Sequence, residues 1–231
     1  MARQRTTDDE RLDHAGLEAI CERLEGLPPL DAATGAISWT TGRFGREVAV
    51  ASSFQDLVLI DLARRQAGDI EVLFLDTGFH FAETLAFVDH VRKTWDLNLT
   101  VTHPDVGPTE ATCGSTGCCQ VRKVEPLARA LTGKKAWLTG LKRVDTPERA
   151  GARVVAFDAE RSIVKVNPLA AWSDDDIEDY VSEHCLPRHP LTYVGYVSIG
   201  CEPTTKPVTD GQHPREGRWP GSDKTECGLH L

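Results

Sequence analysis

The sequence has none of the features by which composition reveals a membrane-bound or exported protein. No apolar run approaches the length of a membrane span, and the polar start over residues 1–10 lacks the apolar region of a signal peptide. Basic residues are not in excess: the net charge is −9, which argues against a general nucleic-acid binder, since such proteins carry a basic stripe. We therefore expect a cytoplasmic protein that binds neither nucleic acid nor membrane.

The pattern that is present is typical of an α/β protein. The 231 residues suffice for one large domain, and a hydrophobic share of 40% is ordinary. Short apolar runs predict buried strands over 48–54, 71–76, 98–103, 135–141 and 163–168, with helices between them over 57–67, 81–95 and 118–131. This alternation predicts a doubly wound, mostly parallel sheet.

Two segments flank this predicted α/β core of residues 46–185. Residues 1–45 form a helical lead-in that ends in a proline pair at 28–29, and Cys21 is expected to lie in the core. Residues 186–231 are rich in glycine and proline, which favours a lid or binding loops and a mobile tail over an idle linker. We interpret residues 1–231 as a single domain.

Polar side chains follow the first two predicted strands. Ser52, Ser53 and Asp56 come after the first, immediately before a helix, and residues 76–78 follow the second. In an open parallel sheet the ligand binds beyond the carboxyl ends of the strands, and a helix N-terminus attracts anions. These turns are therefore candidates for an anion site, although many α/β turns carry Ser and Asp without binding anything.

The sequence has seven cysteines. Because a reducing compartment disfavours disulfides, we expect these cysteines to serve in metal binding or thiol chemistry. Cys118 and Cys119 stand together at the start of a helix with two cations in the next turn, a pattern that suits iron–sulfur ligation; the alternative is a pair of small buried residues. Cys227 lies close to the chain end, where an exposed thiol is a liability unless it is used.

Together these motifs resemble the sulfonucleotide reductases of the PP-loop superfamily, which reduce adenylyl sulfate or 3′-phosphoadenylyl sulfate to sulfite. The turn over 52–56 is similar to a pyrophosphate loop that has lost both glycines, which disfavours ATP as a substrate. The matching segments, in order, are 76–78, 118–127, 139–143, 165–168, 195–200, 215–219 and 224–230.

The resemblance implies that Cys227 attacks the sulfur of adenylyl sulfate, expels AMP and carries an S-sulfonate, from which thioredoxin or glutaredoxin releases sulfite. His230 would assist beside it. Relatives of this kind are commonly homo-oligomers, and no nicotinamide or flavin is expected. The implied substrate-binding residues are Ser52, Ser53, Asp56, Asp76, Thr77, Gly78, Lys123, Arg143, Arg215 and Arg218.

A [4Fe–4S] cluster is implied as well, with Cys118, Cys119 and Cys201 as ligands. The fourth position is Thr204, whose hydroxyl is a poor ligand for iron in such a cluster. The cluster could take a fourth ligand from elsewhere, be labile, or be absent. Cys113 and Cys185 are conceivable replacements that nothing in their spacing recommends.

Three of four cluster cysteines favour adenylyl sulfate as the substrate, because the branch that uses 3′-phosphoadenylyl sulfate lacks them altogether. That branch, without a cluster, is the main alternative. Two more distant alternatives are a PP-loop ATP-dependent enzyme, which would release pyrophosphate, and a non-catalytic iron–sulfur module, which would bind no nucleotide.

Overall fold

The computed structural model describes residues 14–107, 111–209, 211–222 and 224–229. At its centre is a six-stranded sheet with the strand order β3-β2-β1-β4-β6-β5. All pairs are parallel except β5 with β6. The mostly parallel, doubly wound sheet is thus confirmed. The strands are β1 Val48–Ala51, β2 Glu71–Leu75, β3 Leu99–Thr102, β4 Ala136–Thr139, β5 Val155–Asp158 and β6 Ile163–Val166.

Strand β5 was not predicted, because its apolar run is short and it is the antiparallel edge strand, which is only partly covered. Only Val155 is buried along it, and Phe157 is 53% exposed. The central strands fit the prediction because both of their faces are covered. In β1, for example, Val48 and Val50 belong to one buried cluster and Ala49 to another on the opposite face.

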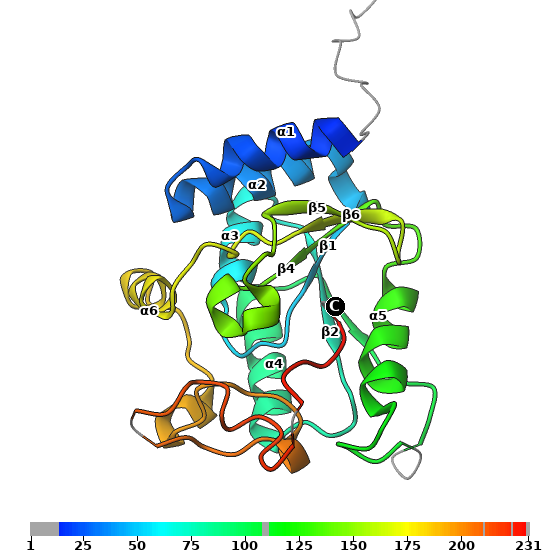
Figure 1. Cartoon of the computed structure of the whole chain (residues 1–231), viewed down its shortest axis with the longest axis vertical. Coiled ribbons are helices and arrows are strands. Elements are labelled where there is room, and N and C mark those ends of the chain that lie inside the picture. The colour runs from blue at the N-terminus through cyan, green and yellow to red at the C-terminus, as the bar shows by residue number, and fades with distance from the viewer. Residues whose placement is uncertain (1–13, 108–110, 210, 223, 230–231) are drawn as a thin grey trace, which may run out of the picture.

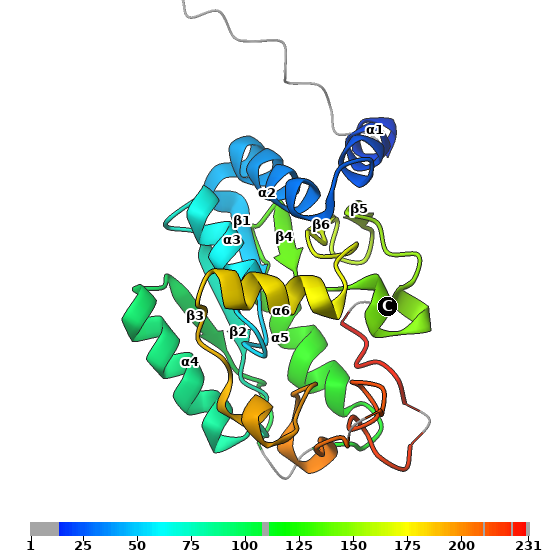
Figure 2. The ribbon, with the colours of Figure 1, turned by 90° about the vertical axis from the view of Figure 1, so that its left-hand side faces the viewer.

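Helices cover both faces of the sheet (Figures 1 and 2). The larger buried cluster joins one face to five helices, whereas the smaller cluster joins the other face to α5, which follows a π-helical turn over Gln120–Val124. The five helices of the larger cluster are α1 His14–Glu25, α2 Pro29–Phe44, α3 Val58–Gln66, α4 Ala82–Trp95 and α6 Asp174–Glu183, and α5 is Glu125–Ala130. No helix in the described ranges is long and apolar enough to cross a membrane.

The N-terminal region differs from its prediction. The proline pair does not end the helical lead-in but separates helix α1, His14–Glu25, from α2. Pro29 occupies the first turn of α2, where its fixed φ suits a helix and its missing N–H has no partner to lose. Both helices pack into the larger core, and Cys21 is fully buried there, as expected.

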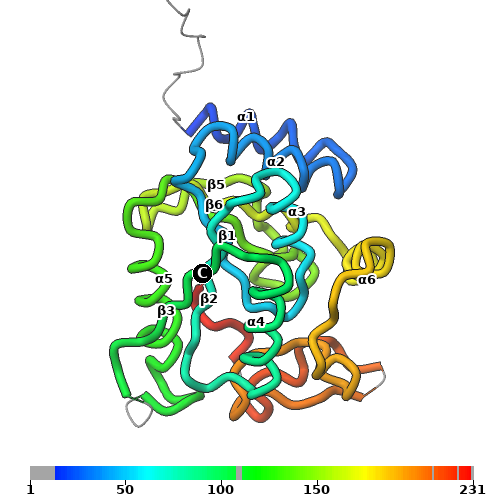
Figure 3. The backbone as a smooth tube through the Cα atoms, turned by 180° about the vertical axis from the view of Figure 1, so that it is seen from behind, coloured from blue at the N-terminus to red at the C-terminus, as the bar shows by residue number. Residues whose placement is uncertain are grey.

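The segment after α6 is irregular apart from short 3-10 turns at Pro190–Val194 and Glu202–Thr204. It lies at the end of the molecule opposite α1 (Figure 1). Backbone bridges pair His80 with Cys201 and Thr205 with Arg218, so the segment is attached to the turn after β2 and then to itself. The tail finally returns toward β1 and β2, as Figures 1 and 3 show.

Candidate active site

A cleft of about 230 Å³ opens at the carboxyl ends of the strands. Strand β1 has β2 and β3 on one side and β4 on the other. The strand order therefore reverses at β1, and the cleft lies at this switch point. Ser52, Ser53 and Asp56 line the cleft, as the sequence suggested, together with residues after β4. Asp56 accepts the Val58 N–H at the start of α3 at 3.1 Å, and burial raises the pKa of its carboxyl.

Five cations reach the cleft from three parts of the chain: Lys123, Lys142, Arg149, Arg215 and Arg218. Lys123 makes no hydrogen bond or salt bridge with any residue in the described ranges. Burial alone lowers the pKa of Lys123, but the nearby thiolates of Cys201 and Cys227 outweigh that effect and raise it. Lys123 therefore keeps its positive charge near the sulfur atoms of Cys201 and Cys227.

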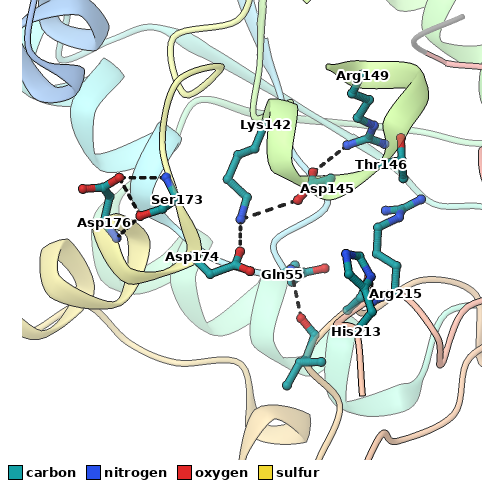
Figure 4. Close-up of polar contacts among 12 residues, drawn as sticks. Gln55, Lys142, Asp145, Thr146, Arg149, Ser173, Asp174, Asp176, His213 and Arg215 are labelled. Atoms are coloured by element: carbon teal, nitrogen blue, oxygen red, sulfur yellow. Dashed lines mark hydrogen bonds and ion pairs between the residues drawn. The ribbon is translucent and has the colours of Figure 1, made fainter. Parts of the chain in front are cut away.

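Lys142 and Arg149 belong to one network of charges on the wall after β4 (Figure 4). Lys142 lies between Asp174, to which it is hydrogen-bonded, and Asp145 at 3.5 Å. Arg149 binds the same Asp145 at 2.7 Å. Arg143, the neighbour that the sequence nominated for substrate binding, does not line the cleft: it binds Glu25 at 2.6 Å.

Cys227 lines the cleft because the preceding residue is held firmly. Glu226 is 7% exposed, and its carboxylate accepts two hydrogen bonds from Arg149, at 2.5 and 2.8 Å, and one from Thr146 at 3.0 Å. Burial tends to raise the pKa of Glu226, but Arg149 holds it below its usual value. Leu229 then packs against the smaller buried cluster. His230 lies outside the described residues.

Arg215 and Arg218 also line the cleft, and both lie near the indole ring of Trp219. The guanidinium carbon of Arg218 lies 4.7 Å from the centre of the indole ring and that of Arg215 lies 5.8 Å away. Burial, followed by Arg215, lowers the pKa of Arg218. A Cβ at Gly200 would lie 2.2 Å from Arg218 Nη2, so only glycine leaves room for this guanidinium.

Three predicted residues, Asp76, Thr77 and Gly78, do not line the cleft. They form a turn behind it, which Arg122 supports by donating to the Thr77 carbonyl at 3.0 Å. Thr77 Oγ1 lies 3.5 Å from Cys201 Sγ instead. The turn of residues 76–78 therefore packs beside Cys201 rather than lining the cleft, although the last residues of β2 do line it. Strand order alone does not reveal this direction.

The cysteines of the predicted cluster lie next to this turn. Cys118 and Cys201 are buried, and Cys119 Sγ accepts a hydrogen bond from Lys224 Nζ at 3.2 Å. A hydrogen bond from Cys113 lowers the pKa of Cys201 to about 4 against the effect of burial, with help from the Lys123 charge. Cys113 also lies 3.6 Å from Thr204 Oγ1. In the ranges described, no three His, Cys, Asp or Glu side chains converge on one metal-ion position.

Sequence reasoning missed several residues of the cleft. Arg149 and Asp174 line it, as do His80 and Gln55. Gln55 joins the first turn to the irregular segment by accepting the Ile199 N–H at 2.9 Å and donating to the Val197 carbonyl at 3.3 Å. The only signal for Gln55 was its place in the turn after β1; nothing in the sequence marked Arg149.

An open parallel sheet with a cation-lined cleft at its switch point defines a nucleotide-binding α/β protein. The comparisons narrow this class. The chain belongs to the phosphoadenosine phosphosulfate reductase family, whose domain matches residues 47–207. It is 44% identical over 242 aligned residues to an adenosine 5′-phosphosulfate reductase of Mycobacteroides abscessus, and the match covers 100% of this chain and 99% of that protein.

Two solved structures share the fold. A phosphoadenylyl-sulfate reductase from Candida auris superimposes with a TM-score of 0.69 at 24% identity, covering 84% of this chain and 98% of that one. An FMN adenylyltransferase from Candida glabrata gives 0.58 at 15% identity, with 92% and 84% covered. These likenesses show the α/β fold that the sequence predicted.

Proposed function

We propose that this chain reduces adenylyl sulfate to sulfite and AMP, with Cys227 as the nucleophile. The observation that carries the proposal is the position of Cys227 Sγ in the cleft at the sheet switch point, where its charge acts on Lys123, Arg149, Arg215 and Arg218. Relatives named adenosine 5′-phosphosulfate reductase support the choice of substrate.

The two ends of the cleft suit the two ends of this nucleotide. The hydroxyls of Ser52 and Ser53 and the N-terminus of α3 favour the adenylyl phosphate. Lys123, Arg215 and Arg218 lie on the side of Cys227 and favour the sulfate. A thiolate that approaches an anionic sulfate needs such cations, which offset the repulsion and stabilise the charge that moves in the transition state.

In the first step the Cys227 thiolate attacks the sulfur of the sulfate group. A sulfur–sulfur bond forms, the bond from that sulfur to the bridging oxygen breaks, and AMP leaves with the electron pair. The product on the protein is a Cys227 S-sulfonate. The Glu226–Arg149 contact, one residue away, fixes the direction of attack.

In the second step a thiolate of thioredoxin, or of glutaredoxin, attacks Cys227 Sγ. Sulfite leaves with the electron pair, and a second thiol of the reductant resolves the mixed disulfide and returns Cys227 as a thiol. A protein reductant must reach a sulfur that lies in a cleft, so the tail has to leave its docked position between the steps. Because this step consumes reduced thiols, we place the reaction in the cytoplasm.

The residues beside the cleft suit the [4Fe–4S] cluster that the family resemblance implies. Cys118, Cys119 and Cys201 offer soft sulfur ligands, and the ammonium groups of Lys123 and Lys224 would offset the charge of thiolate ligands. A cluster bonds its ligands through separate iron atoms, so they need not converge on one point. When bound, the cluster would supply an anionic, redox-active group beside the cleft.

The proposal is tested by measuring sulfite formation from adenylyl sulfate and from 3′-phosphoadenylyl sulfate, side by side, with thioredoxin. We expect turnover of the first, and one sulfonate group on Cys227 when thioredoxin is withheld. Cys227→Ser should lose at least about 10³-fold in turnover with its nucleotide Kd unchanged. Cys185→Ser, at an exposed position, is the matched control. Turnover by Cys227→Ser, or preference for the 3′-phosphorylated nucleotide, would contradict the proposal.

A further inference from the structure

Two segments that are remote in the sequence meet beside Cys201. Cys113 lies in the turn before the first cysteine pair, and Thr204 lies in the 3-10 turn that follows Cys201. Their side chains approach to 3.6 Å, from Cys113 Sγ to Thr204 Oγ1, across 91 positions of sequence. The next residue, Gly114, has φ +88°, and a Cβ there would lie 3.1 Å from the Thr204 methyl group. The turn that contains Cys113 and Gly114 thus packs closely against Thr204.

The same turn brings Cys113 to the other cysteines. The N–H of Ser115 bonds to the Thr112 carbonyl at 3.0 Å, and the N–H of Cys118 bonds to the Ser115 carbonyl at 3.1 Å. These two bonds fold the chain back immediately before the helix. Cys113 consequently lies against Thr204, three residues from Cys201, on the same side as the cysteine pair at 118–119.

We propose that Cys113 supplies the fourth thiolate of the iron–sulfur cluster, in place of the residue at position 204. The inference rests on the proposed function, in which the chain holds such a cluster. The ligand set becomes Cys113, Cys118, Cys119 and Cys201. Each thiol gives up its proton when its sulfur bonds iron, and four thiolates satisfy the cluster without any help from the hydroxyl of Thr204.

Apart from the proposed nucleophile Cys227, two other cysteines remain, and neither lies near the predicted cluster ligands. Cys185 is exposed at the end of α6 and hydrogen-bonds the carbonyl of Ser182. Cys21 is buried between α1 and β5, where its sulfur accepts the Val155 N–H at 3.4 Å. Among the cysteines outside the predicted set, Cys113 is therefore the one that the fold brings to the cluster position.

The experiment measures iron, inorganic sulfide and visible absorbance of the anaerobically purified and reconstituted full chain. Wild type should hold about four irons per chain. Cys113→Ser should lose at least one of them and change the visible spectrum, whereas Cys185→Ser should match wild type. Thr204→Val removes only the hydroxyl and should keep all four. In Cys113→Ser/Thr204→Cys the sulfur is restored from the other segment, so iron should return to the wild-type value.

The outcomes separate this inference from the proposed function. A full complement of iron with an unchanged spectrum in Cys113→Ser would overturn the assignment of Cys113, as would loss of iron in Thr204→Val. Iron-free wild type after reconstitution would also overturn it. Circular dichroism and the nucleotide Kd of each variant show whether iron was lost through unfolding. Sulfite formation that depends on Cys227 tests the proposed function and does not depend on which ligand is fourth.

Discussion

Arg149 holds both carboxylate oxygens of Glu226, with Nε 2.5 Å from Oε1 and Nη2 2.8 Å from Oε2. The pair is largely buried and joins positions 77 residues apart. A bidentate guanidinium–carboxylate pair fixes orientation as well as distance. Since Cys227 follows directly, the pair acts as a positioning device for the thiol and gives the tail one defined docked state.

Glu226→Gln should slow the first chemical step without weakening nucleotide binding. Glutamine keeps the shape of the side chain but loses the charge and one of the two strong acceptors, so Arg149 holds the tail less firmly. We expect a loss of about 10-fold to 10²-fold in the single-turnover rate of S-sulfonate formation. Rapid-quench mass analysis of Cys227 measures that rate, and equilibrium titration measures the nucleotide Kd.

The matched control for this substitution is Glu183→Gln on the exposed end of α6. It removes the same charge at a site remote from the tail and should react at the wild-type rate. A docked tail should also protect the chain end from proteolysis, and Glu226→Gln should reduce that protection. Wild-type rates in Glu226→Gln would show that the Arg149 contact does not position Cys227.

The sequence was sufficient for the parts of the site that depend on regular structure. Ser52 and Asp56 follow a buried parallel strand, and parallel strands all deliver their ends to one edge of the sheet. The sequence did not show which of Lys142 and Arg143 faces the cleft. These neighbours lie in an irregular turn after β4, which has no periodicity that would distinguish a buried position from an exposed one. The sequence named Cys113 only as a conceivable replacement ligand and gave no reason to prefer it over Cys185, because its contact with Thr204 is purely tertiary.

Lys142, rather than the predicted Arg143, should therefore contribute to substrate binding. In Lys142→Ala the carboxylate of Asp174 loses its cation and Asp145 keeps only Arg149, so more negative charge faces the incoming anion and KM for adenylyl sulfate should rise about 10-fold. In Arg143→Ala the exposed Glu25 loses one of its two arginine partners, and the free energy of unfolding should fall by at most about 1 kcal/mol. The KM of Arg143→Ala should remain at the wild-type value.

Steady-state kinetics and urea unfolding of both variants test this assignment, and each variant serves as the control for the other. The exposed pair of Lys135 with Glu47 offers a further control, since Lys135→Ala should change neither quantity appreciably. The assignment is wrong if Arg143→Ala raises KM while Lys142→Ala leaves it unchanged.

His189 attaches the irregular segment to helix α4. Its side chain is fully buried, its Nε2 lies 3.0 Å from Thr84 Oγ1, and its Nδ1 accepts the Leu191 N–H at 3.2 Å. The ring also packs edge-on against Phe87, with ring centres 5.2 Å apart. Burial lowers the pKa of His189 to about 4, and the charge of Glu83 only partly opposes this effect. The imidazole is therefore neutral in the folded protein at neutral pH.

This depressed pKa makes the fold sensitive to acid. The unfolded chain, with a His pKa of 6.5, takes up the proton before the folded chain does, so stability is lost as the pH falls from 6.5 toward 4. His189 should account for a fall of about 2 kcal/mol in the free energy of unfolding between pH 7 and pH 5.

His189→Asn keeps an acceptor for the Leu191 N–H but cannot titrate. The variant should be less stable than wild type at pH 7 and should lose about 2 kcal/mol less stability on acidification. Urea unfolding of wild type and His189→Asn at pH 7 and pH 5 gives the loss of stability of each protein on acidification. The contributions of the other titrating groups cancel when the two losses are subtracted. Parallel losses in wild type and His189→Asn would rule out His189 as the source of the acid sensitivity.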